Sequence, residues 1–202
     1  MALILITPPI LDPITLEDAK LHLRVDTSDD DTLILDEIKT ARRDVEAMSL
    51  HALITQTWDL FLDAFPAALS ITLPLPPLQS VTGVFYTPDG GSEQTFAAAN
   101  YIVDINSTPG RIYLKTTTGG GTGAWPGDIL LPIQGVRIRF ICGFGDNPSD
   151  VDERLVQAVK LMVGHYYENR EGVLVGQGAS AMLLPQGVSS LCNDLRMKVR
   201  RF

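Results

Sequence analysis

The stretch that decides the fold is residues 28–62, SDDDTLILDEIKTARRDVEAMSLHALITQTWDLFL. In its first half, apolar residues recur at intervals of four and three, which places them on one face of a helix. These residues are Ile34, Ile38, Ala41, Val45 and Met48. The serine and aspartates at residues 28–31 can cap the free amides of this helix and oppose its dipole. We therefore predict an amphipathic helix that ends near Met48.

From Ile54 onward the apolar period changes to two. Trp58, Leu60 and Leu62 fall on one side, and polar residues fall between them, apart from Phe61. This alternation predicts a strand. The change of period therefore marks a boundary between a helical part and a β part.

Helical signals lie on both sides of the β part. A threonine can cap a short helix at about 15–23, which carries acids in its first turn. A longer helix, capped by Ser149 or Asp150, is predicted to run to about Asn169. A short last helix is predicted at about 188–197.

The middle of the chain carries further strand patterns, which are separated by turns rich in glycine and proline. They cover residues 71–73, 79–86, 94–96, 101–104, 111–114 and 136–142. We therefore predict an α+β fold: a helical bundle of two N-terminal helices, one long and one short C-terminal helix, with an inserted, mainly antiparallel β region. The predicted parts are residues 1–53, 54–145 and 146–202, and the two helical parts form one domain.

The composition excludes several classes of protein. Of the 202 residues, 45% are hydrophobic and 20% are charged. This apolar fraction is too high for a disordered chain, and no apolar run reaches the ~20 residues that span a bilayer. The first nine residues lack the basic region of a signal peptide, so we expect the protein to stay in the cytoplasm. Cys142 and Cys192 are expected to be reduced, buried thiols.

The formal net charge of −8 is unevenly distributed. Residues 1–47 carry 11 acids and 5 bases, residues 48–150 carry 8 and 4, and residues 151–202 carry 5 and 7. DNA binding depends on Lys and Arg that neutralise phosphates, so the acidic body argues against a protein that grips nucleic acid. The basic excess is concentrated at the C-terminal end, in Arg196, Lys198, Arg200 and Arg201.

Motifs that would indicate catalysis or a bound cofactor are weak. Residues 26–37 carry oxygen ligands at the spacing of a calcium-binding loop, but Asp31 replaces the required glycine, so helix capping is the better interpretation. His165 and Glu168 lie three apart without a matching pair elsewhere, which favours a surface contact over a metal site. The sequence has no P-loop lysine motif and no G-x-S-x-G elbow. We therefore expect that the protein is not an enzyme and that it binds no metal and no cofactor.

Several short segments form an ordered set that covers nearly the whole chain. They are TLEDAK at 15–20, LRVD at 23–26, ALITQTW at 52–58, LPLPPLQSV at 73–81, PGR at 109–111, VRIRF at 136–140, GFG at 143–145 and HYYENRE at 165–171. In this order they resemble the family of head-to-tail connector proteins, the adaptors of phages and prophages with long non-contractile tails. One departure is Ser49-Leu50-His51, where the family leads us to expect a turn that contains glycine.

The resemblance implies a structural protein of the neck of a virion or phage-like particle, made in the cytoplasm of the bacterial host. Its copies would form a twelve-fold ring that docks under the portal protein and presents its other face to a stopper or another neck or tail protein. Such a subunit has enough core to exist as a monomer in solution. DNA would pass through the ring without specific binding, and no membrane would take part.

Two sets of site residues follow from this role. An acidic lumen lets a duplex slide because it does not hold phosphates. We therefore expect some of the following acids to face the channel: Asp29, Asp30, Asp31, Asp36 and Glu37. A basic tail that ends in an aromatic residue suits docking on a partner that orders it. We expect portal contacts from Arg196, Lys198, Arg200, Arg201 and Phe202. The alternatives are a capped, solvated helix for the acids and a frayed C-terminus for the tail.

Two other functions remain open from the sequence. A stopper or tail-completion protein would share the particle but would not bind the portal directly. A small hydrolase or a sugar-binding β module belongs to a different class, and an exposed Trp125 would be its candidate contact.

Overall fold

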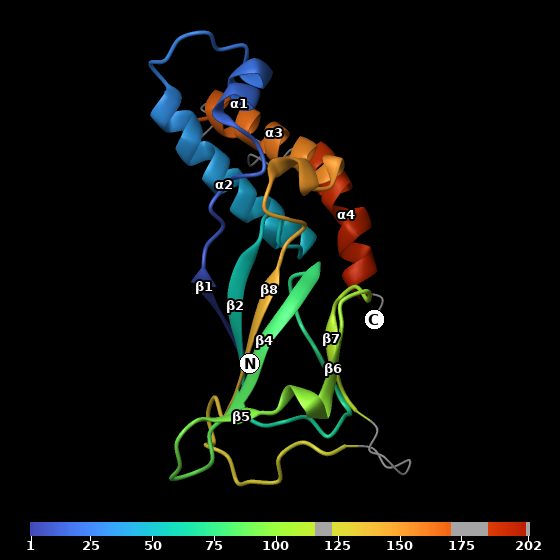
Figure 1. Cartoon of the computed structure of the whole chain (residues 1–202). Coiled ribbons are helices and arrows are strands. Elements are labelled where there is room, and N and C mark those ends of the chain that lie inside the picture. Colours follow the sequence, from blue (N-terminus) through green and yellow to red (C-terminus); the bar gives the residue numbers. More distant parts are fainter. Residues whose placement is uncertain (116–122, 171–185, 201–202) are drawn as a thin grey trace, which may run out of the picture. The chain divides into compact units, whose positions relative to one another are not determined.

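The computed structural model describes residues 1–115, 123–170 and 186–200. The chain divides into two compact units, which we treat separately. The β unit comprises residues 1–8 and 55–143, and the helical unit comprises residues 9–54 and 144–200. The predicted α+β class, a helical bundle with an inserted antiparallel β region, is confirmed (Figure 1).

The described residues of the helical unit form four α-helices: α1 (Leu16–Leu23), α2 (Asp31–Ser49), α3 (Glu153–Glu168) and α4 (Gln186–Arg200). Their apolar stripes form one buried cluster, as the periodicity of residues 34–48 predicts. Its members are at most 5% exposed and include Ile34, Ile38, Ala41, Val45, Leu155, Val159, Met162, Val188, Cys192 and Leu195. The cluster lies where α2, α3 and α4 meet.

The helix starts differ in how well the sequence indicates them. Thr15 forms a capping box, because its hydroxyl accepts a hydrogen bond from the amide of Asp18 at 3.1 Å while the Asp18 carboxylate accepts one from the Thr15 amide. The predicted caps of α3 are wrong. Ser149 and Asp150 lie in a short 3₁₀ turn, and Asp152 caps the helix by accepting from the amide of Arg154.

The ends of α1 and α2 explain the missing glycine of the predicted turn. Arg24 and Leu50 occupy the two C-cap positions with φ of 59° and 61°. This left-handed conformation normally favours glycine, because other residues bring their Cβ too close to the backbone. Ser49-Leu50-His51 therefore forms a left-handed helix end without glycine, at a cost in backbone strain.

The β unit contains two antiparallel sheets. The five-stranded sheet has the order β1-β2-β8-β4-β5 and the three-stranded sheet has the order β3-β7-β6. The strands are β1 (Ala2–Thr7), β2 (Gln56–Leu62), β3 (Ser70–Thr72), β4 (Leu78–Tyr86), β5 (Gln94–Phe96), β6 (Tyr101–Asp104), β7 (Arg111–Leu114) and β8 (Val136–Cys142). Central β8 buries every second residue completely, which follows its alternating sequence.

Strand β1 departs from the prediction of a helical part over residues 1–53. Residues 2–7 pair antiparallel with β2, so the first eight residues belong to the β unit. The sequence ALILIT is apolar up to its final threonine and has no alternation, so its pattern does not identify a strand with one buried face. Its structure depends on β2, more than fifty residues later in the chain.

The chain leaves and re-enters the helical unit at neighbouring positions. The amide of Phe144 donates to the carbonyl of Leu53 at 3.1 Å, and Ile54 forms an isolated parallel bridge with Gly145. The inserted segment between them therefore starts and ends at adjacent points.

Candidate functional site

Neither a metal-binding cluster nor a membrane-spanning helix is found in the described part of the chain. Among its residues, no three His, Cys, Asp or Glu side chains are grouped so that they could hold a metal ion. None of its helices has the length and apolar character that crossing a membrane requires. The calcium-like spacing of residues 26–37 lies across the start of α2, where the side chains have other partners.

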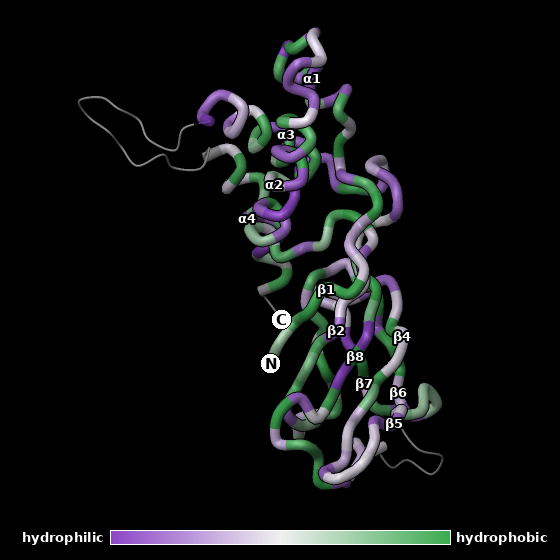
Figure 2. The backbone as a smooth tube through the Cα atoms, turned by 90° about the vertical axis from the view of Figure 1, so that its left-hand side faces the viewer, coloured by the Kyte–Doolittle hydropathy of each residue, from purple (hydrophilic) through white to green (hydrophobic). Residues whose placement is uncertain are grey.

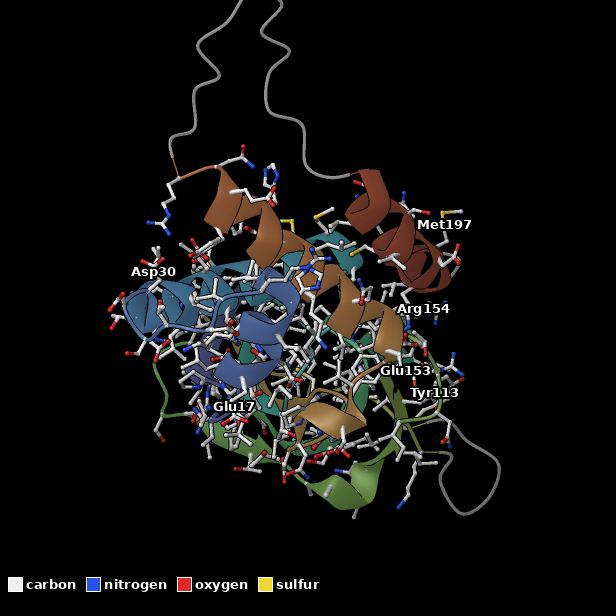
Figure 3. The ribbon with its side chains drawn as sticks, turned by 90° about the horizontal axis from the view of Figure 1, so that it is seen from above. Glu17, Asp30, Tyr113, Glu153, Arg154 and Met197 are labelled. Carbon is white, nitrogen blue, oxygen red and sulfur yellow. The ribbon has the colours of Figure 1, made fainter. Side chains whose placement is uncertain are left out.

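Asp30 stands at the N-cap position of α2, but its carboxylate does not cap the helix. It accepts hydrogen bonds from the Tyr167 hydroxyl at 2.7 Å and from Arg170 at 2.9 Å (Figure 3). The hydrogen bond from Tyr167, followed by that from Arg170, lowers the pKa of Asp30. Asp30 therefore joins the start of α2 to the C-terminal end of α3.

The other predicted channel acids differ in exposure. Asp31 pairs with Lys20 at 2.7 Å, and Asp36 pairs with Lys39 at 3.2 Å in open solvent. Glu37 is only 9% exposed, and burial raises the pKa of its carboxyl group. Asp29 is exposed. Of the five acids, Asp29 and Asp36 thus have their carboxylates most fully in solvent.

The predicted portal residues begin on α4. Arg196 is half-buried, and its Nε is buried without a hydrogen-bond partner among the described residues. Met197 beside it is 52% exposed (Figure 3). The side chains of Lys198 and Arg200, and the whole of Arg201 and Phe202, lie outside the described residues. The inner face of α4 packs on the helical core through Cys192, and burial raises the pKa of that thiol to about 11.

A charged network crosses one face of the five-stranded sheet. Asp59 on β2 is 2% exposed and accepts two hydrogen bonds from Arg139 on β8, at 2.8 and 2.7 Å. Arg137 lies 3.3 Å from the same carboxylate, pairs with Glu93 at 2.6 Å, and covers the Phe85 ring at 4.1 Å. Burial alone would raise the pKa of Asp59, but the arginine contacts outweigh burial and lower the pKa.

Trp125 is half-buried, not exposed. Its ring stacks on Phe65 with centroids 5.1 Å apart and a 6° interplanar angle, and its Nε1 donates to the carbonyl of Ala68 at 2.8 Å. One face of the indole is therefore used in packing, which weakens the case for a sugar contact at this residue.

The β unit exposes three apolar patches that the sequence analysis did not single out. Strand β1 exposes Ile4, Leu5 and Ile6 at 46%, 39% and 42%. Ile102 and Tyr113 are cross-strand neighbours on the three-stranded sheet and are 52% and 41% exposed. Ile129 and Ile133, in the connection to β8, are 82% and 72% exposed. The uncharged, apolar sequence of residues 2–7 was the signal from which the first patch could have been predicted.

Comparison with known proteins gives one family match. Residues 13–74, which include α1, α2 and β2, match the family described as phage gp6-like head-tail connector proteins. Over these residues the chain is similar to that family. No curated protein matches the chain.

Solved structures extend the likeness over almost the whole chain. The chain is 27% identical to one in the neck of an empty gene transfer agent (GTA) particle with C6 symmetry, with a TM-score of 0.75. It is 28% identical to a chain in the virion of a native GTA particle, with a TM-score of 0.75, and 29% identical to one in the neck of a native GTA particle with C12 symmetry, with a TM-score of 0.72. Each likeness covers 97% of this chain and 95% of the other chain.

Proposed function

We propose that this chain is a structural adaptor in the neck of a tailed phage or phage-like particle. Its copies form a twelve-fold ring that joins the portal protein to a stopper or another neck or tail protein and encloses the path of the DNA. The observation that carries this proposal is the likeness to neck chains over 97% of the sequence, with C12 symmetry in one of the matched particles. The role is structural and requires no chemical step.

The acidic body suits a conduit for DNA. The net charge of −8 disfavours a tight hold on phosphates. The start of α2 supplies candidate lumen charges in Asp29 and Asp36, which lie in solvent, and in Asp30 and Asp31, which pair with Arg170 and Lys20. Glu37 is the weakest of the five predicted channel residues because it is buried. A structure of the assembled ring with Asp29 and Asp36 outside the lumen would reject this assignment.

The C-terminal segment is our candidate for the portal contact. It carries the basic excess of the chain in Arg196, Lys198, Arg200 and Arg201 and ends in Phe202. Arg196 is half-buried on α4, so part of its side chain remains in solvent and is available to an acidic acceptor on a partner. Charge-assisted contacts of this kind also fix the orientation of docking.

Electron microscopy of the purified protein mixed with portal rings tests the proposal. The wild-type protein should add a second ring to one face of the portal. A variant in which glutamine replaces all four basic residues, Arg196, Lys198, Arg200 and Arg201, should not form the added ring. Glutamine at Lys39 and Arg43, two exposed basic residues of α2, is the matched control and should leave it intact.

Two outcomes would contradict parts of the proposal. Unchanged stacking by the variant without residues 196–202 would reject the C-terminal segment as the portal contact. If the wild-type protein does not bind the portal alone but binds a preassembled complex of portal and adaptor, it is instead a stopper or tail-completion protein.

A further inference from the structure

Strand β1 leaves one edge of the five-stranded sheet open. It pairs with β2 on one side, and no described strand pairs with its other side. Folded proteins normally protect such edges with charges, prolines or a covering element, because an open edge offers unpaired backbone groups to another chain. Residues 2–7 contain no charge and no proline.

The side chains of β1 make this edge apolar as well as open. Ile4, Leu5 and Ile6 are each about two-fifths exposed, although they lie next to one another in a strand. A bulge between Leu5 and Thr7 interrupts the alternation there. Figure 2 shows β1 as a continuous hydrophobic segment at the surface of the β unit. A strip of this kind is expected to be covered in the assembled state.

A second apolar patch lies on the other side of the same unit. Ile102 on β6 and Tyr113 on β7 are directly opposite each other in the ladder, and both are exposed. Figure 3 labels Tyr113. Figure 1 shows β1 on the left side of the β unit and β6 and β7 on its right side. β6 is also an edge strand of its sheet.

A ring restricts which surfaces can meet. Each copy in a cyclic ring of more than two subunits contacts its neighbours head to tail, so it must present two different surfaces. Two apolar patches on opposite sides of one unit meet this requirement. The third patch, around Ile129 and Ile133, is held by hydrogen bonds to Thr87 and Asp89 just beyond the end of β4 and to Asp63 just beyond the end of β2, so it lies in a connection at the ends of these strands and not along the edge of β1.

We infer that the open edge of β1 in one copy packs against Ile102 and Tyr113 on the three-stranded sheet of the next copy around the ring. The occupant of the β1 edge is thus a second copy of this chain. The contact buries Ile4, Leu5 and Ile6 and brings the open edge of β1 to the edge strand β6 of the neighbour. This inference rests on the proposed ring.

Paired cysteines test the contact directly. The variant Ile4→Cys/Ile102→Cys is treated with a short bis-maleimide, both in the portal complex and as concentrated protein alone. The native Cys142 and Cys192 are fully buried and are not expected to react. The double variant should give a ladder of cross-linked species up to twelve copies. Each single variant should stay a monomer, and an equal mixture of the two should stop at dimers.

The control and the contrary results separate this inference from the proposed function. Ile4→Cys/Ile129→Cys has the same chemistry at a more accessible site, 82% exposed against 52% for Ile102, and should give no ladder. The inference is overturned by the absence of a ladder in both preparations, by dimers of Ile4→Cys alone, or by an equal ladder from the control. Wild-type stacking on the portal without a ladder rejects only this contact. A ladder without stacking keeps the contact and rejects the portal role.

Discussion

Replacing Asp59 with asparagine should destabilise the β unit through a single change of charge. Removing one partner of a fully buried ion pair costs about 3–5 kcal/mol, because the remaining charge is left without compensation. Two features reduce that cost here. The Arg139 side chain is 35% exposed and can regain water, and Arg137 keeps Glu93 at 2.6 Å. We therefore expect a loss of about 2 kcal/mol, below the range for a fully buried pair.

Urea unfolding followed by tryptophan fluorescence measures the stability of the β unit, in which Asp59 lies. The chain has two tryptophans, Trp58 and Trp125, and both lie in the β unit. With a urea dependence of about 2 kcal/mol per molar, the midpoint should fall by about 1 M. Arg111→Gln is the matched control, since it removes an exposed pair with Asp104 in the same unit and should cost less than about 1 kcal/mol.

The pH dependence gives a second check on the same residue. The arginines lower the folded-state pKa of Asp59, so its contribution is fully present above the unfolded pKa of about 3.9 and is lost as the pH falls through the folded pKa. The difference between wild type and Asp59→Asn should therefore shrink below pH 4. An unchanged midpoint at pH 7, or a loss no larger than that of Arg111→Gln, would refute the reasoning.

Three further predictions concern the helical unit, for which circular dichroism at 222 nm reports the midpoint of unfolding. Thr15→Ala removes the capping box and should cost about 1 kcal/mol, whereas Thr32→Ala, at an exposed position of α2, should cost less than half of that. Glu37→Gln should raise the midpoint at pH 7 but not at pH 4, because burial raises the pKa of Glu37 and the cost of its charge is lost as the pH falls through that pKa. Arg24→Gly should stabilise the unit by about 0.5 kcal/mol, since it relieves the left-handed backbone at the end of α1, and Arg24→Ala should not. Equal midpoints for Thr15→Ala and Thr32→Ala, or for Arg24→Gly and Arg24→Ala, would contradict the corresponding prediction. For Glu37→Gln, a midpoint equal to that of the wild type at pH 7 would do so.

Local sequence patterns identify the elements whose type and buried face follow from the spacing of their apolar residues. Helix α2 and strand β8 each carry a repeat long enough to fix both the type of element and its buried face. The capping box at Thr15 is equally local, because all of its groups lie within four residues. Such features depend on few distant contacts and can be predicted from the sequence.

Features that depend on distant residues could not be predicted in the same way. Asp59 occupies a position that the alternation assigns to solvent, yet two arginines from β8, about eighty residues later, enclose it. Strand β1 has no period of its own and forms on β2. Asp30 precedes a helix and so resembles a cap, but it binds Tyr167 and Arg170 near the other end of the chain. The predicted site acids therefore separate into exposed and internally paired residues only once the structure is known.

The two ends of the inserted segment lie next to each other, and this affects how the fold can diversify in evolution. Since Leu53 and Phe144 are joined by a hydrogen bond, the helical unit needs only a short linker to close if the segment between them is exchanged. Loop-closure entropy rises slowly with length, so inserts of very different size cost the host nearly the same. Among the described residues, only 1–8 belong to the β unit without being part of the inserted segment. Evolution could therefore exchange the inserted segment while the helical unit is kept. Such an exchange would have to include the N-terminal strand or leave that strand without its partner.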